Sequence, residues 1–349
     1  MLNRREFAAA GVASTLNAAA VKAQSGQRIK AAFLGASHSH GLDKVRLVHS
    51  SPDFELAGVW EENPSVRDGL QKAVAKIRWM SKADILADKS ISAVFIESDV
   101  KSHGPLAIEA LRAGKHCHIE KPPAETLRDM REIVSLAKST GLIIQSGYMW
   151  RHNPAVEKAL EAARSGWLGQ IYLIQARMNT LIGTDRRPEW NLFSGGQMFE
   201  QGAHLVDIVV RLMGKPARIT PFLRHDGPFN DTLKDNTAAV LEYGTAMAIL
   251  VSSVLQPNAN AHRAIEIFGT NGNAVIRPIE PPSLEIDLQK AAGPYQAGKQ
   301  KPALRPYERY SGDIAALASA IAGSKPLEVN ADTELAIQEV LLTASGMIG

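Results

Sequence analysis

Two segments of the chain carry side chains that could take part in proton transfer: Lys121 lies in one, and Glu200 and His204 lie in the other. Lys121 stands between Glu120 and the dipeptide Pro122-Pro123, and His204 follows Glu200 by four positions. A neutral histidine can accept a hydroxyl proton near pH 7, and a lysine ammonium can polarise the reacting oxygen or relay a proton. The surrounding elements must bring the two segments together before such chemistry is possible.

The segment that carries His204 predicts a helix from the glycines at 195 and 196 to about Met213. Glu200, His204 and Asp207 then fall on neighbouring turns of one face. Glu200 would orient the imidazole or bind a substrate hydroxyl. Asp207 is either a further partner of this group or a surface charge. Without Lys121, His204 would be interpreted as a packing residue.

Upstream of residue 150, short apolar runs alternate with helical stretches, which predicts a doubly wound α/β domain with a parallel sheet. The expected strands are Ile29–Leu34, Phe54–Trp60, Ala93–Glu97, Cys117–Glu120 and Ile143–Gly147. The expected helices are Leu42–Ser50, Ser65–Lys76, Lys82–Ala87, Pro105–Ala113 and Leu127–Thr140. Lys121 then lies at the carboxyl edge of the sheet, where folds of this kind bind their ligands.

The turn after the first expected strand has the position of a phosphate-binding loop, but two of its three glycines are replaced. Gly35 supplies the tight turn, Ser37 and His40 stand at the second and third glycine positions, His38 lies between them, and Gly41 comes one place late. A histidine at the third position should hold helix and strand slightly apart. Taken alone, the loop is equally consistent with a turn in an unrelated α/β protein.

Glu61 stands at the end of the second expected strand, where a carboxylate can accept hydrogen bonds from ribose hydroxyls. This carboxylate would repel a 2′-phosphate, so the expected cofactor is NAD, with NADP disfavoured. The alternative is a solvated charge at a strand end, which is our interpretation of Glu62.

Downstream of residue 150, strand patterns predominate, and we expect a second, α+β domain over residues 151–349. Its expected strands are Gln170–Met178, Arg218–Leu223, Asn236–Tyr243, Thr245–Val254, His262–Phe268 and Ala274–Arg277, with Gln289–Arg305 as a surface loop. They would form a mostly antiparallel open sheet with helices on one face. The other face would be free to meet another subunit, so we expect a homodimer or homotetramer.

Several short motifs follow one another along nearly the whole chain after its N-terminal segment. They are Ser98–His103, Ala113–His116, Glu120–Pro123, Gly147–Pro154 and Glu200-x-x-x-His204. Together they resemble the glucose–fructose oxidoreductase and inositol dehydrogenase family (Gfo/Idh/MocA), with departures at Ser37, His40, Asp99 and Val100. The resemblance implies a Rossmann domain over residues 27–150, a C-terminal substrate and oligomerisation domain, and NAD(P)-dependent hydride transfer to or from a sugar, polyol or derivative.

The resemblance also implies roles for single residues. Lys121 would lie beside the nicotinamide, followed by a cis peptide, and would be catalytic together with His204 and Glu200, the last at a position that is usually Asp. Glu200 and His204 would also bind the substrate. Cofactor contacts are expected from Gly35, Ser37, His38, His40, Glu61, Ser98, His103, Glu120, Lys121 and Arg151. The alternatives are that His103 caps the next helix and that Arg151 forms an ion pair.

The loop before the glycine pair could cover a bound sugar. It contains Arg186, Arg187, Trp190 and Phe193, of which we expect Arg187 and Trp190 to bind substrate. Aromatic faces stack on sugar rings, and arginine binds hydroxyls or carboxylates. The alternative is a solvated basic loop.

Two histidine pairs could suggest a metal. They are His38-x-His40 and His116-x-His118, and alternate residues of a strand share a face. Neither pair has the additional cysteine or acidic ligand nearby that a closed site needs. We therefore expect no metal.

Residues 1–23 are expected to be a twin-arginine export signal rather than part of the fold. Arg4-Arg5 precede an Ala-rich stretch, and Val21-Lys22-Ala23 offers small residues for cleavage. The single cysteine, Cys117, has nothing to mispair with in an oxidising compartment. We expect the mature chain in the periplasm, or outside a single-membrane cell.

The composition is that of a globular protein of about two domains. Of 349 residues, 45% are hydrophobic and 21% charged, which excludes disordered, collagen-like and disulfide-rich classes. No apolar run approaches the roughly 18 residues of a membrane span. The net charge of +3 is too small and scattered for a nucleic-acid surface. The expected partner is a small carbohydrate or polyol.

Export would leave the protein without a pool of soluble NAD, so the cofactor would have to stay bound. In one cycle a second carbonyl substrate re-oxidises the nicotinamide. In the other, transient oxidation of a sugar allows elimination of a glycosidic bond before the hydride returns. We expect the first, an oxidoreductase, with an NAD-dependent glycoside hydrolase as the alternative. A non-catalytic sugar-binding relative is a third hypothesis, favoured by Ser37 and His40 and opposed by Lys121 and His204.

Overall fold

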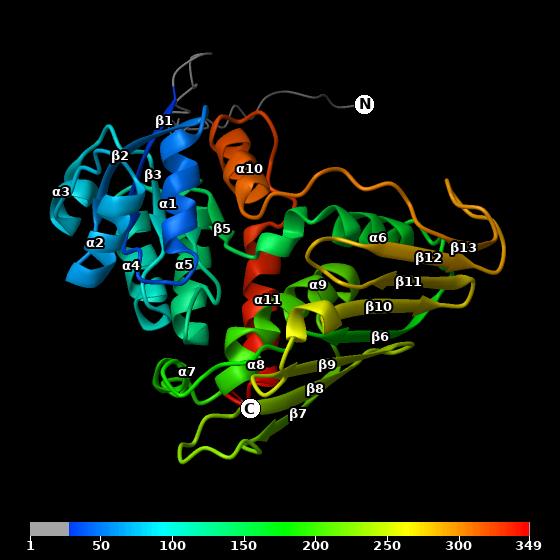
Figure 1. Ribbon diagram of the computed structural model, residues 1–349. Helices are drawn as coiled ribbons and strands as arrows, with labels where there is room; N and C mark the ends of the chain where they lie inside the picture. The colour runs from blue at the N-terminus through cyan, green and yellow to red at the C-terminus, as the bar shows by residue number, and fades with distance from the viewer. Residues whose placement is uncertain (1–27, 349) are drawn as a thin grey trace, which may run out of the picture.

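Five parallel strands form the sheet of the N-terminal domain in the computed structural model, which describes residues 28–348. They stand in the order β2-β1-β3-β4-β5 (Figure 1). Their bounds are β1 (Ile29–Leu34), β2 (Phe54–Trp60), β3 (Ala93–Ile96), β4 (His116–Ile119) and β5 (Ile144–Ser146). Because β1 pairs with β2 on one side and β3 on the other, the winding reverses at β1. The predicted doubly wound domain is confirmed, and ligands of such folds bind outside the carboxyl ends of the strands at this reversal.

Helices cover both faces of this sheet because apolar side chains alternate along β1. Ala32 and Leu34 share a core with α4 and α5, whereas Ala31 and Phe33 share another with α1, α2 and α10. The helices of these two layers are α1 (Gly41–Ser50), α2 (Pro64–Ala73), α3 (Lys82–Ala87), α4 (Val100–Arg112), α5 (Leu127–Thr140) and α10 (Ser311–Ile321). Figure 1 shows that α10, from the end of the chain, lies beside α1.

Helix α4 begins at Val100, well before the expected start at Pro105. Asp99 caps it by accepting a hydrogen bond from the N–H of Ser102 at 3.3 Å. Pro105 and His103 therefore both lie inside the helix. The expected boundary and the capping alternative for His103 are wrong, because an aspartate cap rather than the proline marks this helix start.

An eight-stranded sheet forms the centre of the C-terminal domain, in the order β13-β12-β11-β10-β6-β9-β8-β7. All of its pairs are antiparallel except β6 with β9. Its strands are β6 (Ile171–Arg177), β7 (Arg218–Arg224), β8 (Asn236–Glu242), β9 (Met247–Ser253), β10 (Ala264–Gly269), β11 (Gly272–Ile276), β12 (Leu284–Leu288) and β13 (Gly298–Gln300). The mostly antiparallel sheet is thus confirmed.

Strands β12 and β13 extend the sheet beyond the expected elements. In β12, Leu284, Ile286 and Leu288 alternate with polar residues and are buried, a strand pattern that the expected elements lack. β13 lies inside the segment expected to be a loop, and its residues Gly298, Lys299 and Gln300 pair at the edge of the sheet. Its sequence has no hydrophobic period that could have predicted it.

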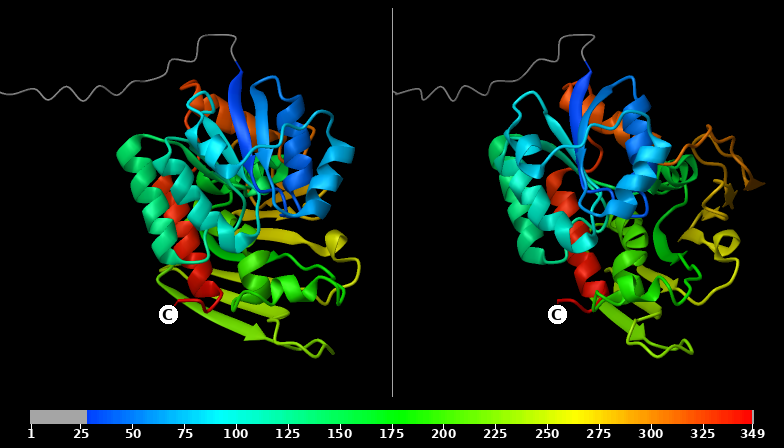
Figure 2. Two further views of the ribbon diagram at one scale, coloured as in Figure 1. Left: turned by 90° about the vertical axis from the view of Figure 1, so that its left-hand side faces the viewer. Right: turned by 60° about the vertical axis from the view of Figure 1, so that its left-hand side comes forward.

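Helices cover only one face of this sheet. They are α6 (Pro154–Arg164), α9 (Gly202–Met213) and α11 (Ala331–Ala344), which contact β11, β9 and β7 respectively. Figure 2 shows the helices gathered on the side of the sheet that meets the N-terminal domain. On the strands, Phe222 and Met247 are exposed large apolar residues. Association through the uncovered face stays a prediction.

The segment expected to be one helix through His204 is two helices. α8 (Gly196–Glu200) ends at Glu200, Gln201 separates the two, and α9 begins at Gly202. A Cβ at Gly202 would lie 2.4 Å from the sulfur of Met198, so the side chain of Met198 packs closely against the start of α9. Glu200 and His204 thus belong to different helices, and the expectation of a continuous helix is wrong.

Residues 1–23, expected to be an export signal, lie outside the described residues. Among the helices of residues 28–348, none combines the length and the apolar character needed to cross a bilayer.

Candidate active site

Lys121 and Glu200 form a buried ion pair between the two domains. Lys121 follows β4 at the carboxyl edge of the first sheet, and its Nζ lies 2.5 Å from Oε1 of Glu200 at the end of α8. The two residues are only 3% and 7% exposed. Burial favours the neutral acid, but the ammonium of Lys121 and nearby His38 hold the pKa of Glu200 well below its usual range. Glu200 is therefore a carboxylate at neutral pH.

His204 lies in the first turn of α9, against two aromatic rings. The imidazole centroid is 5.0 Å from that of Trp150 and 5.9 Å from that of Tyr148. His204 is 2% exposed, and its Nδ1 has no hydrogen-bond partner among residues 28–348. Burial, followed by the charge of Lys121, lowers the pKa of His204 well below the usual value. The ring is neutral at pH 7, as an acceptor of a hydroxyl proton must be.

Asp207 is buried and ion-paired, so the alternative of a surface charge is wrong, and its partner is Arg151 rather than Glu200 or His204. Its Oδ1 accepts hydrogen bonds from Nε and Nη2 of Arg151 at 2.9 and 2.8 Å. Arg151 also binds Glu334 of α11 through Nη1 at 2.6 Å, and its guanidinium carbon lies 4.9 Å from the centroid of the Tyr148 ring. The ion-pair alternative for Arg151 is thus seen in the structure, and contact with a cofactor stays a prediction.

The altered phosphate loop brings His38 and His40 to the same carboxylate. Nδ1 of His40 lies 3.1 Å from Oε1 of Glu120, and Nδ1 of His38 lies 4.0 Å from that oxygen. On its other side, Nε2 of His38 lies 3.9 Å from Oε1 of Glu200. His38 therefore stands between the two carboxylates of the site.

Gly41 replaces the third glycine of the fingerprint. A Cβ at Gly41 would lie 2.5 Å from the carbonyl oxygen of Ala36, so the start of α1 packs tightly on the loop only because this residue is glycine. The ring of His40 turns away from this contact, towards Glu120 and the ring of Tyr310 at a centroid distance of 5.1 Å. The expectation that His40 holds helix and strand apart is wrong, because the loop is one residue longer.

Three residues near the end of β1 and β2 have properties that suit the binding of a dinucleotide: Gly35, Ser37 and Glu61. Gly35 has φ +82°, and a Cβ there would lie 2.6 Å from that of Ser98, so only glycine fits this turn. Glu61 accepts hydrogen bonds from the N–H groups of Ala36 at 2.7 Å and Asn63 at 2.8 Å. Its oxygens keep further lone pairs for ribose hydroxyls. Ser37 is exposed on the loop. The residues present fit the cofactor.

Ser98, which precedes α4, and His103, inside α4, support the edge of the sheet. The ring of His103 is fully buried, with Nδ1 2.9 Å from the carbonyl oxygen of Pro122 and Nε2 3.1 Å from that of Ser98. Burial lowers the pKa of His103 to about 4, so the neutral ring donates to one of these oxygens. His103 thereby anchors the Lys121-Pro122 segment, whose peptide bond is cis. Direct cofactor contacts of both residues stay predictions.

A second buried charge cluster, not expected from the sequence, underlies the site. Nζ of Lys44 donates to Oε1 of Glu97 at 2.8 Å and to Oε2 of Glu120, and it lies 2.8 Å from Nε2 of His118. Positions 41, 44, 45 and 48 form the buried face of α1, so helical periodicity places this lysine inside. Two strand-end carboxylates, Glu97 and Glu120, need a cation there.

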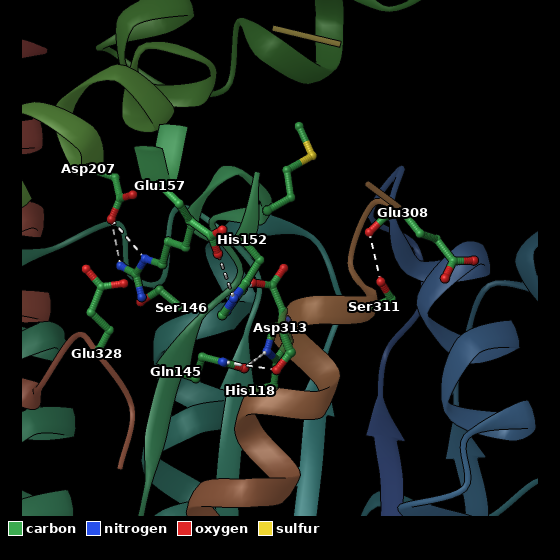
Figure 3. Close-up of polar contacts among 12 residues, drawn as sticks. His118, Gln145, Ser146, His152, Glu157, Asp207, Glu308, Ser311, Asp313 and Glu328 are labelled. Atoms are coloured by element: carbon green, nitrogen blue, oxygen red, sulfur yellow. Dashed lines mark hydrogen bonds and ion pairs between the residues drawn. The ribbon is translucent and has the colours of Figure 1, made fainter. Parts of the chain in front are cut away.

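A chain of polar contacts runs from this cluster to α10. Nδ1 of His118 lies 2.8 Å from Oε1 of Gln145, and Nε2 of Gln145 donates to the carbonyl oxygen of Asp313 at 3.1 Å (Figure 3). Burial lowers the pKa of His118 to about 3, so Nε2 of its neutral ring accepts from Lys44. The chain holds α10 and α1 against the strand ends that carry the site.

That the protein binds no metal stays a prediction. The reason given for it, the lack of an acidic ligand near the histidine pairs, is wrong. Nitrogens of His38 and His40 and an oxygen of Glu120 lie within 4.8 Å of one another, so the fold supplies the acidic group that the sequence pattern lacked. A second such group comprises Glu97, His118 and Glu120. Lys44 already brings a positive charge to both carboxylates.

Arg187 and Trp190 are buried in a small cluster of their own. Arg187 lies in α7 (Arg187–Trp190) and binds Asp231 through Nε at 2.5 Å and Asp235 through Nη2 at 3.0 Å. Trp190 packs with Ile182, Leu233 and Val254. A solvated loop is thus excluded for these two residues. Substrate binding by them stays a prediction that requires this loop to open.

The sequence matches two family descriptions, one for each domain. Residues 29–148 match an oxidoreductase family with an NAD-binding Rossmann fold, and residues 156–275 match the GFO/IDH/MocA C-terminal domain. Among curated relatives, scyllo-inositol 2-dehydrogenase (NAD(+)) of Bacillus subtilis is 27% identical over 71% of this chain and 74% of its own length. The 2,7-anhydro-N-acetylneuraminate hydratase of Escherichia coli is 23% identical over 74% and 68%.

A solved structure agrees with the fold of both domains together. UDP-N-acetylglucosamine 3-dehydrogenase of Acidithiobacillus ferrooxidans superposes with a TM-score of 0.77 at 18% identity, covering 92% of this chain and 98% of that one. The two family matches stand in the order in which the parallel and antiparallel sheets follow each other here. The chain therefore belongs to the Gfo/Idh/MocA family of oxidoreductases, with an NAD-binding Rossmann domain at its N-terminus.

Proposed function

We propose that this protein is an exported oxidoreductase that transfers a hydride between a sugar, polyol or derivative and a nicotinamide that stays bound. The observation that carries the proposal is the buried group of Lys121, Glu200 and His204 at the boundary between the domains. An ammonium and a neutral imidazole are the two groups that alcohol oxidation requires around the reacting oxygen. The relation to an enzyme named for an inositol favours a polyol or sugar as substrate.

The bound nicotinamide would supply the hydride acceptor or donor. Gly35, Ser37 and Glu61 would hold the dinucleotide, and the carboxylate of Glu61 would favour NAD over NADP. Lys121 would bind the reacting oxygen and stabilise negative charge that develops on it, while neutral His204 accepts the hydroxyl proton. Glu200 would orient the ammonium. Because Lys121 is paired and buried, its contact with Glu200 must loosen as substrate enters.

Export and a retained cofactor are part of the same proposal. The twin-arginine pathway carries proteins that have already folded, which suits a protein loaded with its dinucleotide in the cytoplasm. A second carbonyl compound would then re-oxidise the nicotinamide in place. The N-terminal pattern of residues 1–23 supports the location.

A redox-neutral cycle is the second candidate. A relative named as a hydratase favours it, since the addition of water to a substrate involves no net oxidation. Transient oxidation of a sugar would acidify a neighbouring C–H bond, a glycosidic bond would break by elimination, and the hydride would return. The same Lys121 and His204 would serve both cycles.

One experiment separates these candidates. The purified protein, with no dinucleotide added, is mixed with a panel of sugars, polyols and aryl glycosides, and the absorbance of reduced nicotinamide is followed. An oxidoreductase accumulates reduced cofactor until a carbonyl acceptor is added. A hydrolase releases the aglycone without any acceptor. A protein that does neither, and carries no dinucleotide, is the sugar-binding relative, and the proposal is then wrong.

A further inference from the structure

The groups proposed for catalysis are enclosed, so the proton of the reaction needs a path to water. Lys121, Glu200 and His204 are all buried. Within the part of the chain that the structure describes, Oε2 of Glu200 and Nδ1 of His204 are buried without a hydrogen-bond partner. Oxidation of an alcohol releases one proton here, and reduction of a carbonyl consumes one.

His38 connects the catalytic carboxylate to a second carboxylate. Its Nε2 faces Glu200 at 3.9 Å, and its Nδ1 faces Glu120 at 4.0 Å. Both distances exceed a hydrogen bond, so a small rotation of the ring must close each contact in turn. Nδ1 also accepts the N–H of His40 at 3.3 Å, which places the proton of the resting ring on Nε2.

His40 connects the second carboxylate to the outside. Its Nδ1 lies 3.1 Å from Oε1 of Glu120, and its side chain is 14% exposed, whereas the side chain of Glu120 is fully buried. The rings of His38 and His40 meet edge to face at a centroid distance of 4.7 Å. His38 follows the second glycine position of the fingerprint, and His40 stands at the third. The two histidines thus lie one after the other between Glu200 and water.

We infer that His38, Glu120 and His40 form a proton path between Glu200 and solvent. This inference rests on the proposed function. When the substrate O–H bond breaks, His204 takes the proton and the C–H electron pair leaves as hydride to the bound nicotinamide. His204 then returns to its neutral state as the proton passes to Glu200. Release uses the other tautomer of His38, in which Nδ1 carries the proton, so that Nε2 accepts the proton from Glu200 and Nδ1 gives its own to Glu120. His40 takes that proton on Nδ1 and releases the proton of its Nε2 to water. Reduction runs the same steps backwards and starts from the resting tautomer of His38, with its proton on Nε2.

Burial and the neighbouring charges set the pKa values of Glu120 and His40 on the path. Burial raises the pKa of Glu120, but Lys44, with lesser contributions from His40 and His38, holds it well below its usual range. Burial lowers the pKa of His40 to about 4, although Glu120 opposes that shift. The remaining groups that face the two rings are Lys121, Glu200, His103 and Tyr310. A proton on the path is therefore held briefly and passed on.

The first test follows the proton itself. In single turnovers of the loaded protein, a pH-indicator dye in weak buffer reports proton release while absorbance reports hydride transfer. We expect His38→Gln and His40→Ala to slow both roughly 10²-fold, the lower end of proton-transfer effects. Added imidazole should restore His40→Ala, because it can occupy the place of the lost ring. His152→Ala, a half-buried histidine next to Asp313 outside the path (Figure 3), should keep the rate of the wild type.

The second test needs no bound dinucleotide. Histidine signals of the cofactor-free protein are titrated by NMR, and we expect His40 to titrate below its ordinary range. His38→Gln should move that titration upward, since the charge of His38 disfavours protonation of His40. If the pKa of His40 is the same in the wild type and in His38→Gln, the path is wrong.

The outcomes distinguish the path from the function. If the wild type transfers hydride and both variants release protons at its rate, the path is wrong and the proposed function stands. If the slowed His40→Ala is not restored by imidazole, its effect is structural, and the path is also wrong. If the loaded wild type transfers no hydride to any sugar or polyol, the proposed function fails and the path fails with it.

Discussion

Replacing Lys44 by methionine tests whether the buried charge cluster holds the loop helix on the strand ends. The side chain is fully buried, and its ammonium is the cation shared by Glu97 and Glu120. Methionine keeps most of the volume but leaves the buried carboxylate of Glu120 and the carboxyl group of Glu97 without this cation. Breaking a buried pair in this way costs about 3–5 kcal/mol. That is a large part of a typical domain's 5–15 kcal/mol of stability, stated as an order of magnitude.

The assay is urea denaturation of the cofactor-free protein at pH 7, followed by tryptophan fluorescence. Lys82→Met is the matched control, because its pair with Glu109 is 2.7 Å long but the side chains are 35% and 43% exposed. That control should change the free energy of unfolding by less than about 1 kcal/mol. Adding Glu97→Gln to Lys44→Met should reduce the pH dependence of the loss, since it replaces a carboxyl group that ionises at higher pH.

The pH dependence of the Lys44→Met loss has a defined sign. Burial, and then the charge of Glu120, already raise the pKa of Glu97 to about 8 against the opposing charge of Lys44. A carboxyl group whose folded pKa is raised stabilises the fold below its unfolded pKa and loses this contribution as the pH rises through the folded pKa. Removing Lys44 raises it further, so the loss should be smaller at pH 6 than at pH 8. A loss equal to that of Lys82→Met and independent of pH would refute this reasoning.

Three further predictions concern the cofactor, the base and the open sheet. Glu61→Ser should shift the ratio of NAD to NADP affinity towards NADP by roughly tenfold or more, because it removes the carboxylate that repels a 2′-phosphate. The control Glu62→Ser, at an exposed position, should leave the ratio unchanged. Titration of each variant with both dinucleotides measures this ratio. Because burial and Lys121 keep His204 neutral, kcat/KM should show no ionisation near pH 6.5 that is lost in His204→Asn. Ile249→Asp on the uncovered face of β9 should lower the assembly's mass in light scattering if that face joins subunits; an unchanged oligomer would place the interface elsewhere.

The sequence could predict those parts of the site that depend on local pattern. Lys121 at a strand end, Glu61 after β2 and the turn at Gly35 each follow from one strand and the residues next to it. The structure places them where the alternation of strands and helices indicates. Burial of Asp207 could not be decided, because its partners Arg151 and Glu334 are far away in the chain.

Other parts of the site depend on contacts between residues that are distant in the sequence. Glu120 reaches His38 and His40 across the sheet edge, so no local spacing could supply the acidic group next to the histidine pair. Lys44 was detectable in principle, since buried helix positions recur every three or four residues. Arg187 was expected to bind substrate, with a solvated basic loop as the alternative, and only the fold supplies its partners Asp231 and Asp235.

The central claim is that a nicotinamide dinucleotide stays in this protein at the boundary between its domains. The most direct measurement is mass spectrometry of the small molecules released when the purified protein, recovered from the periplasm, is denatured. The account predicts close to one NAD per chain. A protein that is folded, exported and free of any dinucleotide would contradict it.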